Sequence, residues 1–397
     1  MLRELEVLDG GHLKLDWEER KAFFEEELEE QVRVSVKQML EQALEAERTD
    51  RLAVGRYVRD QESRRDYRNG YYLRDLGTRL GLLRGLRVPR TRRGYRSELL
   101  PRYQRRQEAV NDLVREAFLR GIATRQVGAV LEPVLGEAYS AQTVSRIARG
   151  LDRAVQAYHR RRLRDEYSYL FLDGVVLRVR DGGGKLRRRV VLVAYGITVG
   201  GRRELLAYRQ TAGESETAWT AFLQNLYLRG LLGDRLRLVV TDGSPGLAAA
   251  VGLVYPQARV QRCWAHKLRN LADKVAKKEG SCVAQAAAIY RAQSRSQAER
   301  AFRRWARRWQ QRRPRAVACL ERDLQELLNF FLVPHAHWKK VRTTNVIERS
   351  FREVRRRTRP MTSFTNPASC DRIVFGVIAH LNRSWEKKPL KEFTQQP

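Results

Sequence analysis

Three acidic residues stand where their carboxylates could take part in phosphoryl transfer. Asp173 follows the apolar run 167–172, Asp242 follows the run 236–241, and Glu348 lies in the helical pattern 343–357. Carboxylate oxygens bind hard divalent cations, and two strands and a helix can bring three of them to a pair of such ions. The alternative is that each acid merely caps a strand end, because a chain with 46 acidic residues holds some by chance.

The elements around Asp242 are the most sharply defined. The β-branched run 236–241 predicts a buried strand, and Gly243 follows the acid directly. Ser244 then suits the N-cap of a helix, and Pro245 suits its first position, where a missing N–H has no cost. Asp242 is therefore expected to project from the end of a strand, just before a helix.

The segment around the first two acids predicts an α/β fold. Runs 168–181, 188–199 and 202–211 are strand-like, with a glycine turn at 182–185 that makes the first two a hairpin. A helix should begin at Ser215, and the strand 236–241 follows it. Residues 264–342 are helical in pattern almost throughout, and Trp305 and Trp309 are expected in their core rather than on a flipped base.

The blocks around Asp173, Asp242 and Glu348 resemble the bacterial insertion-sequence transposases related to plant Mutator elements. The resemblance covers roughly residues 50–385 and is strongest at 241–246 and 343–349. It implies a ribonuclease H-like catalytic core with a mixed sheet, formed by 166–263 and 343–384 and interrupted by the all-helical insertion 264–342. It also implies that the three acids form an Asp, Asp, Glu triad that holds two Mg²⁺ ions, for which Mn²⁺ can substitute.

The implied function is DNA transposition, with cleavage and joining of strands at the terminal inverted repeats of a mobile element. One alternative is a catalytically inactive or domesticated relative that only binds DNA. Two others are a different ribonuclease H-like nuclease, such as a resolvase, and a basic structural protein that binds nucleic acid. No small-molecule substrate is implied.

A Cys-x-x-His pair, Cys263 and His266, lies about 20 residues after Asp242, beyond the helix predicted to start there. The resemblance implies that His266 lies near the scissile phosphate, because family members carry this pair at the same place. Half of a zinc site completed by His335 and His337 is one alternative. The other is a buried cysteine and a helix-start histidine that serve packing only.

The charge of the chain favours a polyanionic partner. The formal net charge is +32 and the pI is about 10.7, although residues 1–50 alone carry 15 acids and 7 bases. Such a field attracts DNA, and phosphate neutralisation makes the affinity salt-sensitive. Double-stranded DNA, as terminal repeat and as target, is the expected partner.

Two regions before the catalytic core are expected to bind that DNA. Residues 51–106 mix arginines with tyrosines, and Asn69-Gly70 is a turn signal. Residues 107–165 are helical and fit a helix-turn-helix, with an ordinary helical bundle as the alternative. The helix of Glu348 adds a basic row that includes position 359. The expected DNA contacts are Arg68, Arg90, Arg92, Arg93, Gln142, Thr143, Arg146, Arg349, Arg352, Arg355 and Arg356.

The two ends of the chain differ in pattern. Residues 1–50 contain a long acidic amphipathic helix over 16–48, which either packs on its own domain or forms a dimer. At least a homodimer is expected, since two transposon ends must be held together. Residues 385–397 are expected to be a polar tail. No apolar run is long enough for a membrane span and no signal peptide is recognisable, so a cytosolic, nucleoid-associated protein is expected.

Overall fold

A computed structural model describes residues 17–60, 62–276, 279–358 and 363–394. The chain divides into two compact units. The first comprises the described residues up to 117 together with 124–147, and the second comprises 118–123 and the described residues from 148 onward. No helix in the described ranges has the length and apolar character needed to cross a membrane.

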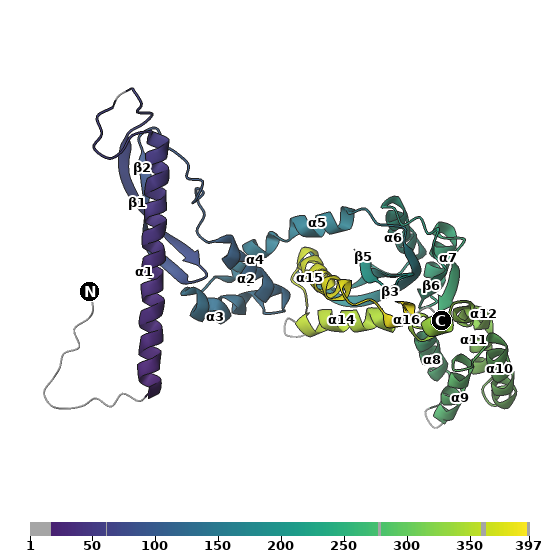
Figure 1. Ribbon diagram of the computed structural model, residues 1–397. Coiled ribbons are helices and arrows are strands. Elements are labelled where there is room, and N and C mark those ends of the chain that lie inside the picture. The colour runs from purple at the N-terminus through teal and green to yellow at the C-terminus, as the bar shows by residue number, and fades with distance from the viewer. Residues whose placement is uncertain (1–16, 61, 277–278, 359–362, 395–397) are drawn as a thin grey trace. The chain divides into compact units, whose positions relative to one another are not determined.

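The first unit is built on a long helix and a β-hairpin. Helix α1 (Trp17–Leu52) packs against β2 (Gly81–Thr91), which pairs antiparallel with β1 (Arg68–Thr78) (Figure 1). Region 51–106 is thus centred on strands, and the expected helices lie on either side of it, at 17–52 and within 108–149. The small core between helix and hairpin consists of Leu44, Leu76, Leu86, Val88 and Leu100.

The hairpin turn lies away from the predicted position. Asn69 and Gly70 fall inside β1, at an irregularity in the pairing where Gly70 has a φ of +64°. The chain reverses instead at 79–80, where the Thr78 hydroxyl donates to the Gly81 carbonyl at 2.8 Å. The glycine signal therefore marked a bulge, which also favours a positive φ.

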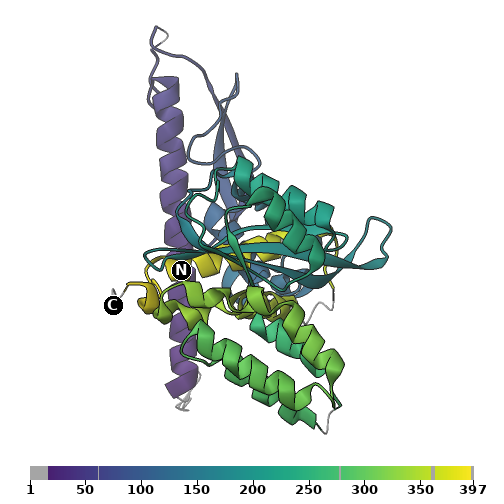
Figure 2. The ribbon, with the colours of Figure 1, turned by 90° about the vertical axis from the view of Figure 1, so that its right-hand side faces the viewer.

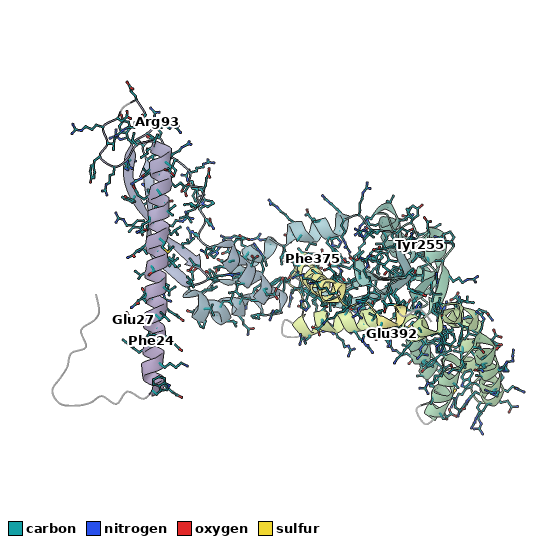
Figure 3. All side chains as sticks on the ribbon, in the orientation of Figure 1. Phe24, Glu27, Arg93, Tyr255, Phe375 and Glu392 are labelled. Carbon is teal, nitrogen blue, oxygen red and sulfur yellow. The ribbon has the colours of Figure 1, made fainter. Side chains whose placement is uncertain are left out.

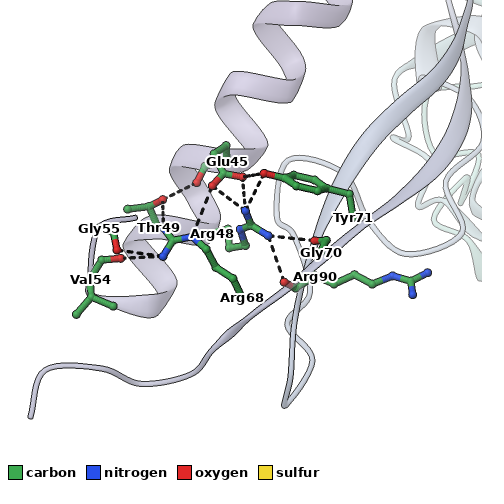
Figure 4. A network of polar contacts seen from close by, with 9 residues as sticks. All are labelled: Glu45, Arg48, Thr49, Val54, Gly55, Arg68, Gly70, Tyr71 and Arg90. Atoms are coloured by element: carbon green, nitrogen blue, oxygen red, sulfur yellow. Dashed lines mark hydrogen bonds and ion pairs between the residues drawn. The ribbon is translucent and has the colours of Figure 1, made fainter. Parts of the chain in front are cut away.

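A buried arginine ties α1 to the hairpin (Figure 4). The Arg48 side chain is 2% exposed and donates to both carboxylate oxygens of Glu45 at 2.6 and 2.8 Å. It also donates to the Tyr71 hydroxyl at 3.0 Å and to the carbonyls of Gly70 and Arg90. A buried guanidinium needs such partners, because an unpaired charge is costly to bury.

Short helices follow the hairpin. They are α2 (Glu108–Leu119), α3 (Thr124–Leu135) and α4 (Ala141–Arg149). Ser140 caps α4, since its hydroxyl oxygen accepts the Thr143 N–H at 3.2 Å. Gly128 of α3 lies so close to Tyr139 that a Cβ there would meet the Tyr139 carbonyl. Glycine is therefore required for this helix to approach the segment that leads into α4.

The second unit contains a mixed five-stranded sheet, as predicted. Its order is β5-β4-β3-β6-β7, in which β3 pairs antiparallel with β4 and parallel with β6. The strand β5 is antiparallel to β4, and β7 is parallel to β6. The bounds are β3 (Tyr167–Arg180), β4 (Leu186–Thr198), β5 (Arg203–Thr211), β6 (Leu238–Thr241) and β7 (Arg259–Arg262).

Helices cover both faces of this sheet (Figures 1 and 2). On one face, α6 (Glu216–Leu228) and α7 (Pro245–Val254) pack over Leu170 and Leu172. On the other, α14 (Asn345–Thr358) and α15 (Pro367–Glu386) pack over Phe171 and its neighbours. Alternate β3 residues therefore enter different cores, as the strand period of two requires. Helix α5 (Asp152–Arg160) precedes the sheet.

The insertion between β7 and α14 is helical in its described residues. It contains α8 (Trp264–Ala272), α9 (Gly280–Tyr290), α10 (Arg295–Trp309), α11 (Pro314–Arg322), α12 (Leu324–Leu327) and α13 (Trp338–Val341). Trp305 and Trp309 are buried, and each indole N–H has a protein acceptor, so their prediction as core residues is confirmed. The two ends of the insertion meet, since the backbone N–H of Trp264 donates to the backbone carbonyl of Arg342 at 3.0 Å.

The C-terminal segment is more ordered than the predicted tail. Helix α15 continues to Glu386, and α16 (Lys391–Thr394) follows it. Phe393 is buried against Tyr169 and stacks on His337, with ring centroids 4.0 Å apart. The buried side chains of Leu390 and Phe393 dock this end, and the Leu390 N–H donates to the Gly201 carbonyl at 2.9 Å.

Candidate active site

Asp173 and Asp242 stand at matching positions on adjacent strands. Strands β3 and β6 are parallel, with Phe171 paired to Val240, and each aspartate lies two residues beyond its member of that pair. Residues two apart on a strand share a face, so Asp173 projects toward the same side of the sheet as Phe171. Asp242 follows the end of β6 as predicted, whereas Asp173 lies inside β3 and not at a strand end, and the pairing brings the two acids together.

The Asp173 carboxyl group is buried among charges. Its side chain is 6% exposed, and Oδ1 accepts the Gly174 N–H at 2.9 Å. Burial raises the pKa of Asp173 to about 6, the positive charge of His266 opposes that rise, and the negative charges of Asp242 and Glu348 add to it. Asp242 and Glu348 therefore both lie within electrostatic reach of Asp173.

The turn after Asp242 needs glycine. Asp242 Oδ1 accepts the Ser244 N–H at 2.9 Å, which closes a tight turn before α7. Gly243 has a φ of +87°, and a Cβ at this position would lie 2.8 Å from Nη1 of Arg262. Helix α7 starts at Pro245 as predicted, but the Ser244 hydroxyl makes no capping hydrogen bond.

Glu348 lies in the first turn of α14 and faces cations from α8. Its Oε1 is 3.3 Å from Nη2 of Arg269 and 3.9 Å from Nε2 of His266. His266, the predicted fourth site residue, thus lies beside the carboxylates. A hydrogen bond with the Cys263 thiol raises the pKa of His266 to about 9, and the Asp173 charge also raises it.

Cys263 joins the starts of two helices. Thr344 stands directly before α14, and Cys263 stands directly before α8. The backbone N–H of Thr344 donates to Cys263 Sγ at 3.2 Å. The Thr344 hydroxyl lies 3.5 Å from both Cys263 Sγ and His266 Nδ1. The zinc alternative gains no support, because His337 instead contacts the Tyr169 hydroxyl at 2.8 Å through its Nδ1.

The donor set suits a hard cation. Three carboxylates that repel one another, one of them buried, supply the oxygen ligands that Mg²⁺ prefers. Within the described part of the chain, no three His, Cys, Asp or Glu side chains are gathered tightly enough to hold a metal ion. The contacts of Glu348 with Arg269 and His266 explain part of this, because they direct its carboxylate toward α8.

Sequence reasoning missed a fourth carboxyl group and a cation. Glu214 lies against Gly174, next to Asp173, and burial together with the Asp242 charge raises its pKa. It comes three residues after β5 and directly before the N-cap Ser215 of α6, so no apolar run ends at it as one ends at Asp242. Arg269 gave no such signal, because it is one of many arginines on a helix.

A family model described as "Transposase, Mutator family" matches residues 11–388. The chain belongs to this family. A transposase for insertion sequence element ISRM5 from Rhizobium meliloti (strain 1021) is 37% identical over 356 residues, which cover 89% of this chain and 88% of that protein. The transposase for IS256 in transposon Tn4001 from Staphylococcus aureus is 31% identical over 380 residues, covering 94% and 96%. The predicted family is thus confirmed.

The predicted DNA contacts of this Mutator-family chain differ in their surroundings. In the first unit Arg90, Arg92 and Arg93 are exposed, and Arg93 projects from the ribbon (Figure 3). The Arg68 guanidinium is instead used within the unit, with Thr49 Oγ1 at 3.0 Å and the Gly55 carbonyl at 3.2 Å (Figure 4). Arg68 is therefore a weaker choice for a phosphate contact than the three exposed arginines.

A basic cleft of about 1060 Å³ lies on the same unit, beside the hairpin. Its cationic members all lie in the predicted basic region 51–106: Arg74, Arg90, Arg93, Arg96, Arg102, Arg105 and Arg106. On α4, Gln142 and Arg146 are exposed, whereas the Thr143 hydroxyl lies 3.1 Å from Ser140 Oγ.

Helix α14 presents the remaining arginines. Arg349, Arg352, Arg355 and Arg356 are exposed, and Arg356 pairs with Glu353 at 3.0 Å. Helical spacing places Arg352 and Arg355 on the side of Glu348, as predicted. Position 359, the last member of that row, lies outside the described residues.

Proposed function

We propose that this protein is a DNA transposase that cleaves and joins strands at the terminal inverted repeats of its element, using divalent metal ions. The observation that carries the proposal is the convergence of Asp173, Asp242 and Glu348, whose charges act on one buried site. The strand order and the helices on both faces support a ribonuclease H-like core, which would supply this geometry.

In this proposal the three carboxylates hold two Mg²⁺ ions, with Mn²⁺ as a substitute. When bound, the ions would lower the pKa of an attacking water or 3′-hydroxyl and stabilise the leaving oxygen of an in-line displacement. His266, whose raised pKa keeps it protonated near neutral pH, would place a positive charge beside the scissile phosphate. No covalent intermediate with the protein is required.

The basic surfaces would bind the DNA. The cleft beside the hairpin and the exposed face of α4 would contact the terminal repeat, and the arginines of α14 would hold phosphates next to Glu348. Because two ends must be held together, we expect at least a dimer. Phe24, on the N-terminal half of α1, is one of several apolar side chains exposed there that a second copy could cover (Figure 3).

The test is cleavage and joining of a DNA duplex that carries the element's end, with Mg²⁺, by the wild type, by Asp242→Asn and by Asp234→Asn. Asp234 is exposed just before β6 and serves as the matched control. We expect activity in the wild type and the control, and its loss in Asp242→Asn while DNA binding survives. Binding without cleavage by the wild type in both Mg²⁺ and Mn²⁺ would instead indicate the inactive DNA-binding relative.

A further inference from the structure

One segment of the helical insertion carries positive charges alone. Residues 300–315 contain eight arginines and neither Asp nor Glu. Arg313 is half-buried and pairs with Glu279, whereas the other seven are exposed. Among the described residues, no protein group forms a hydrogen bond or an ion pair with any of these seven guanidinium groups. The insertion therefore presents a set of cations that the fold itself does not use.

Five of the seven form a stripe along α10. An α-helix turns about 100° and rises about 1.5 Å per residue, so arginines three and four positions apart follow one another on one face over about 12 Å. The members of this arginine stripe are Arg300, Arg303, Arg304, Arg307 and Arg308. Trp305 and Trp309 lie on the buried side of the helix and donate hydrogen bonds to groups of α9. These bonds fix α10 to α9, beside which it lies in Figure 1.

The helix itself does not explain the stripe. Cations in the last turn interact favourably with the helix dipole, which accounts for Arg307 and Arg308 but not for the three arginines nearer the middle of α10. Like charges three or four residues apart destabilise a helix unless acids lie among them. The one acid in α10 is Glu299, which lies 3.4 Å from Arg295. An anion from outside the helix would relieve this repulsion.

Duplex DNA supplies anions at a matching density. It carries one negative charge per about 1.7 Å of its axis, so about seven phosphates lie along a length equal to that of the stripe. A guanidinium group binds phosphate through two parallel hydrogen bonds. Contacts with phosphates carry no base information, so such a surface binds a duplex of any sequence.

An acidic protein surface fits the stripe less well. The most acidic segment of the described chain is the N-terminal half of α1, which a second copy could supply. Phe23 and Phe24 are each 66% exposed among its glutamates. A stripe of arginines offers these apolar rings no apolar partner of comparable size, whereas a DNA backbone makes no such demand.

We propose that the arginine stripe of α10 binds the phosphate backbone of duplex DNA, separately from the basic cleft of the first unit. The inference rests on the proposed function, from which it takes DNA as the partner. It assigns the insertion a role in holding DNA without regard to sequence. Target DNA, or DNA beyond the terminal repeat, is the segment that such a surface suits.

The test is arginine footprinting of the full-length protein. The protein is treated with phenylglyoxal, which modifies accessible guanidinium groups, with and without a duplex that carries the element's end and flanking DNA. Ca²⁺ replaces Mg²⁺ so that the DNA stays intact, and modification is measured by peptide mass spectrometry. We expect saturating DNA to lower the modification of the stripe severalfold. Arg188 and Arg235, exposed outside the insertion, should react equally in both samples.

The other outcomes are distinct. An unprotected stripe in protein that has bound the duplex would overturn this inference and leave the proposed function standing. Protection that appears without DNA and grows with protein concentration would also overturn it, because a second copy would then cover the stripe. A protein that left the duplex unbound would overturn the inference and the proposed function together.

A triple variant measures how many phosphates the stripe neutralises. Arg300→Gln, Arg304→Gln and Arg308→Gln together should lower the slope of log affinity against log salt by about 2 to 3, since each phosphate contributes about 0.9. Glutamine keeps the helix propensity of arginine, so α10 should still form. The control variant loses the same charge from three exposed arginines on separate elements, Arg153, Arg188 and Arg235. Equal slopes for the two variants would show that only net charge matters and would overturn the inference.

Discussion

The Thr344 backbone N–H donates to Sγ of Cys263 at 3.2 Å, although the two residues are 81 positions apart. Each stands directly before a helix that carries a site residue, His266 on α8 and Glu348 on α14. This contact therefore fixes the two helix starts relative to each other. The separation between imidazole and carboxylate depends on it.

Replacing Cys263 by Ala should harm both stability and activity. The variant leaves the buried Thr344 N–H without its acceptor, which costs about 1 to 3 kcal/mol in the free energy of unfolding. The cleavage rate should fall by a larger factor than the DNA affinity, because the contact that fixes the start of α14 (Glu348) relative to the start of α8 (His266) is lost. Urea unfolding and a cleavage assay measure the two effects. Cys282→Ala, at an equally buried cysteine inside the insertion, should lose stability through packing alone and keep its cleavage rate per folded molecule.

Replacing Arg269 by Gln should lower the Mg²⁺ concentration that is needed for half-maximal cleavage. Arg269 is 59% exposed and holds Glu348 Oε1 at 3.3 Å, so it competes with a cation for that oxygen. An exposed ion pair of this kind contributes about 0.2 to 1 kcal/mol, which predicts a fall of about 1.4- to 5-fold in the half-saturating Mg²⁺ concentration for cleavage. Arg187→Gln removes a comparable pair with Asp181 on the β3–β4 hairpin and should leave this value unchanged. A higher Mg²⁺ requirement in Arg269→Gln would show that the contact helps the site instead.

Substitutions at Arg68 and Arg93 should have different effects: the first should lower stability, and the second should lower DNA affinity. Arg68→Gln removes hydrogen bonds to Thr49 and Gly55, so the free energy of unfolding should fall by about 1 to 3 kcal/mol. Arg93→Gln should leave stability within about 0.5 kcal/mol and lower the slope of log affinity against log salt by about 1. Urea titrations and binding isotherms at several salt concentrations decide the matter. A stable Arg68→Gln with the larger loss of DNA affinity would reverse the assignment.

His159 should make stability depend on pH in mildly acidic solution. Burial lowers its pKa to about 4, and the charges of Arg229 and Arg209 lower it further, against about 6.5 in the unfolded chain. Below pH 6.5 the unfolded state takes up a proton that the folded state refuses, so the free energy of unfolding falls as the pH drops toward 4. Since the side chain is only half-buried, we expect a loss of about 1 to 3 kcal/mol.

The measurement is urea unfolding of the wild type and His159→Gln at pH 7 and pH 4.5. The variant cannot titrate at this position, so its loss of stability between the two pH values should be smaller. His335→Gln, at an exposed histidine, controls for the change of residue type. Equal losses in the wild type and His159→Gln would show that this histidine does not govern the effect.

Sequence patterns predicted the elements of the site because the signals were local. An apolar run that ends at an acid correctly placed Asp242 after a strand, and a capping pattern identified the start of α7. The same signal placed Asp173 at a strand end, whereas β3 continues past it to Arg180. The contacts of Glu348 with Arg269, and of Cys263 with Thr344, join residues 79 and 81 positions apart, and no local pattern encodes them. The predicted position of the hairpin turn at Gly70 was wrong, because a glycine with positive φ occurs both in turns and in β-bulges.

The hydrogen bond from Trp264 to the carbonyl of Arg342 closes the helical insertion at its base. A segment that leaves and re-enters a fold at one point adds little strain to the host, and the entropy of closing it grows slowly with its length. Helix α8 at the start of the insertion must keep its place, because it carries His266 and Arg269 beside Glu348. A change in the length of the chain beyond α8 can therefore leave the starts of α8 and α14 together.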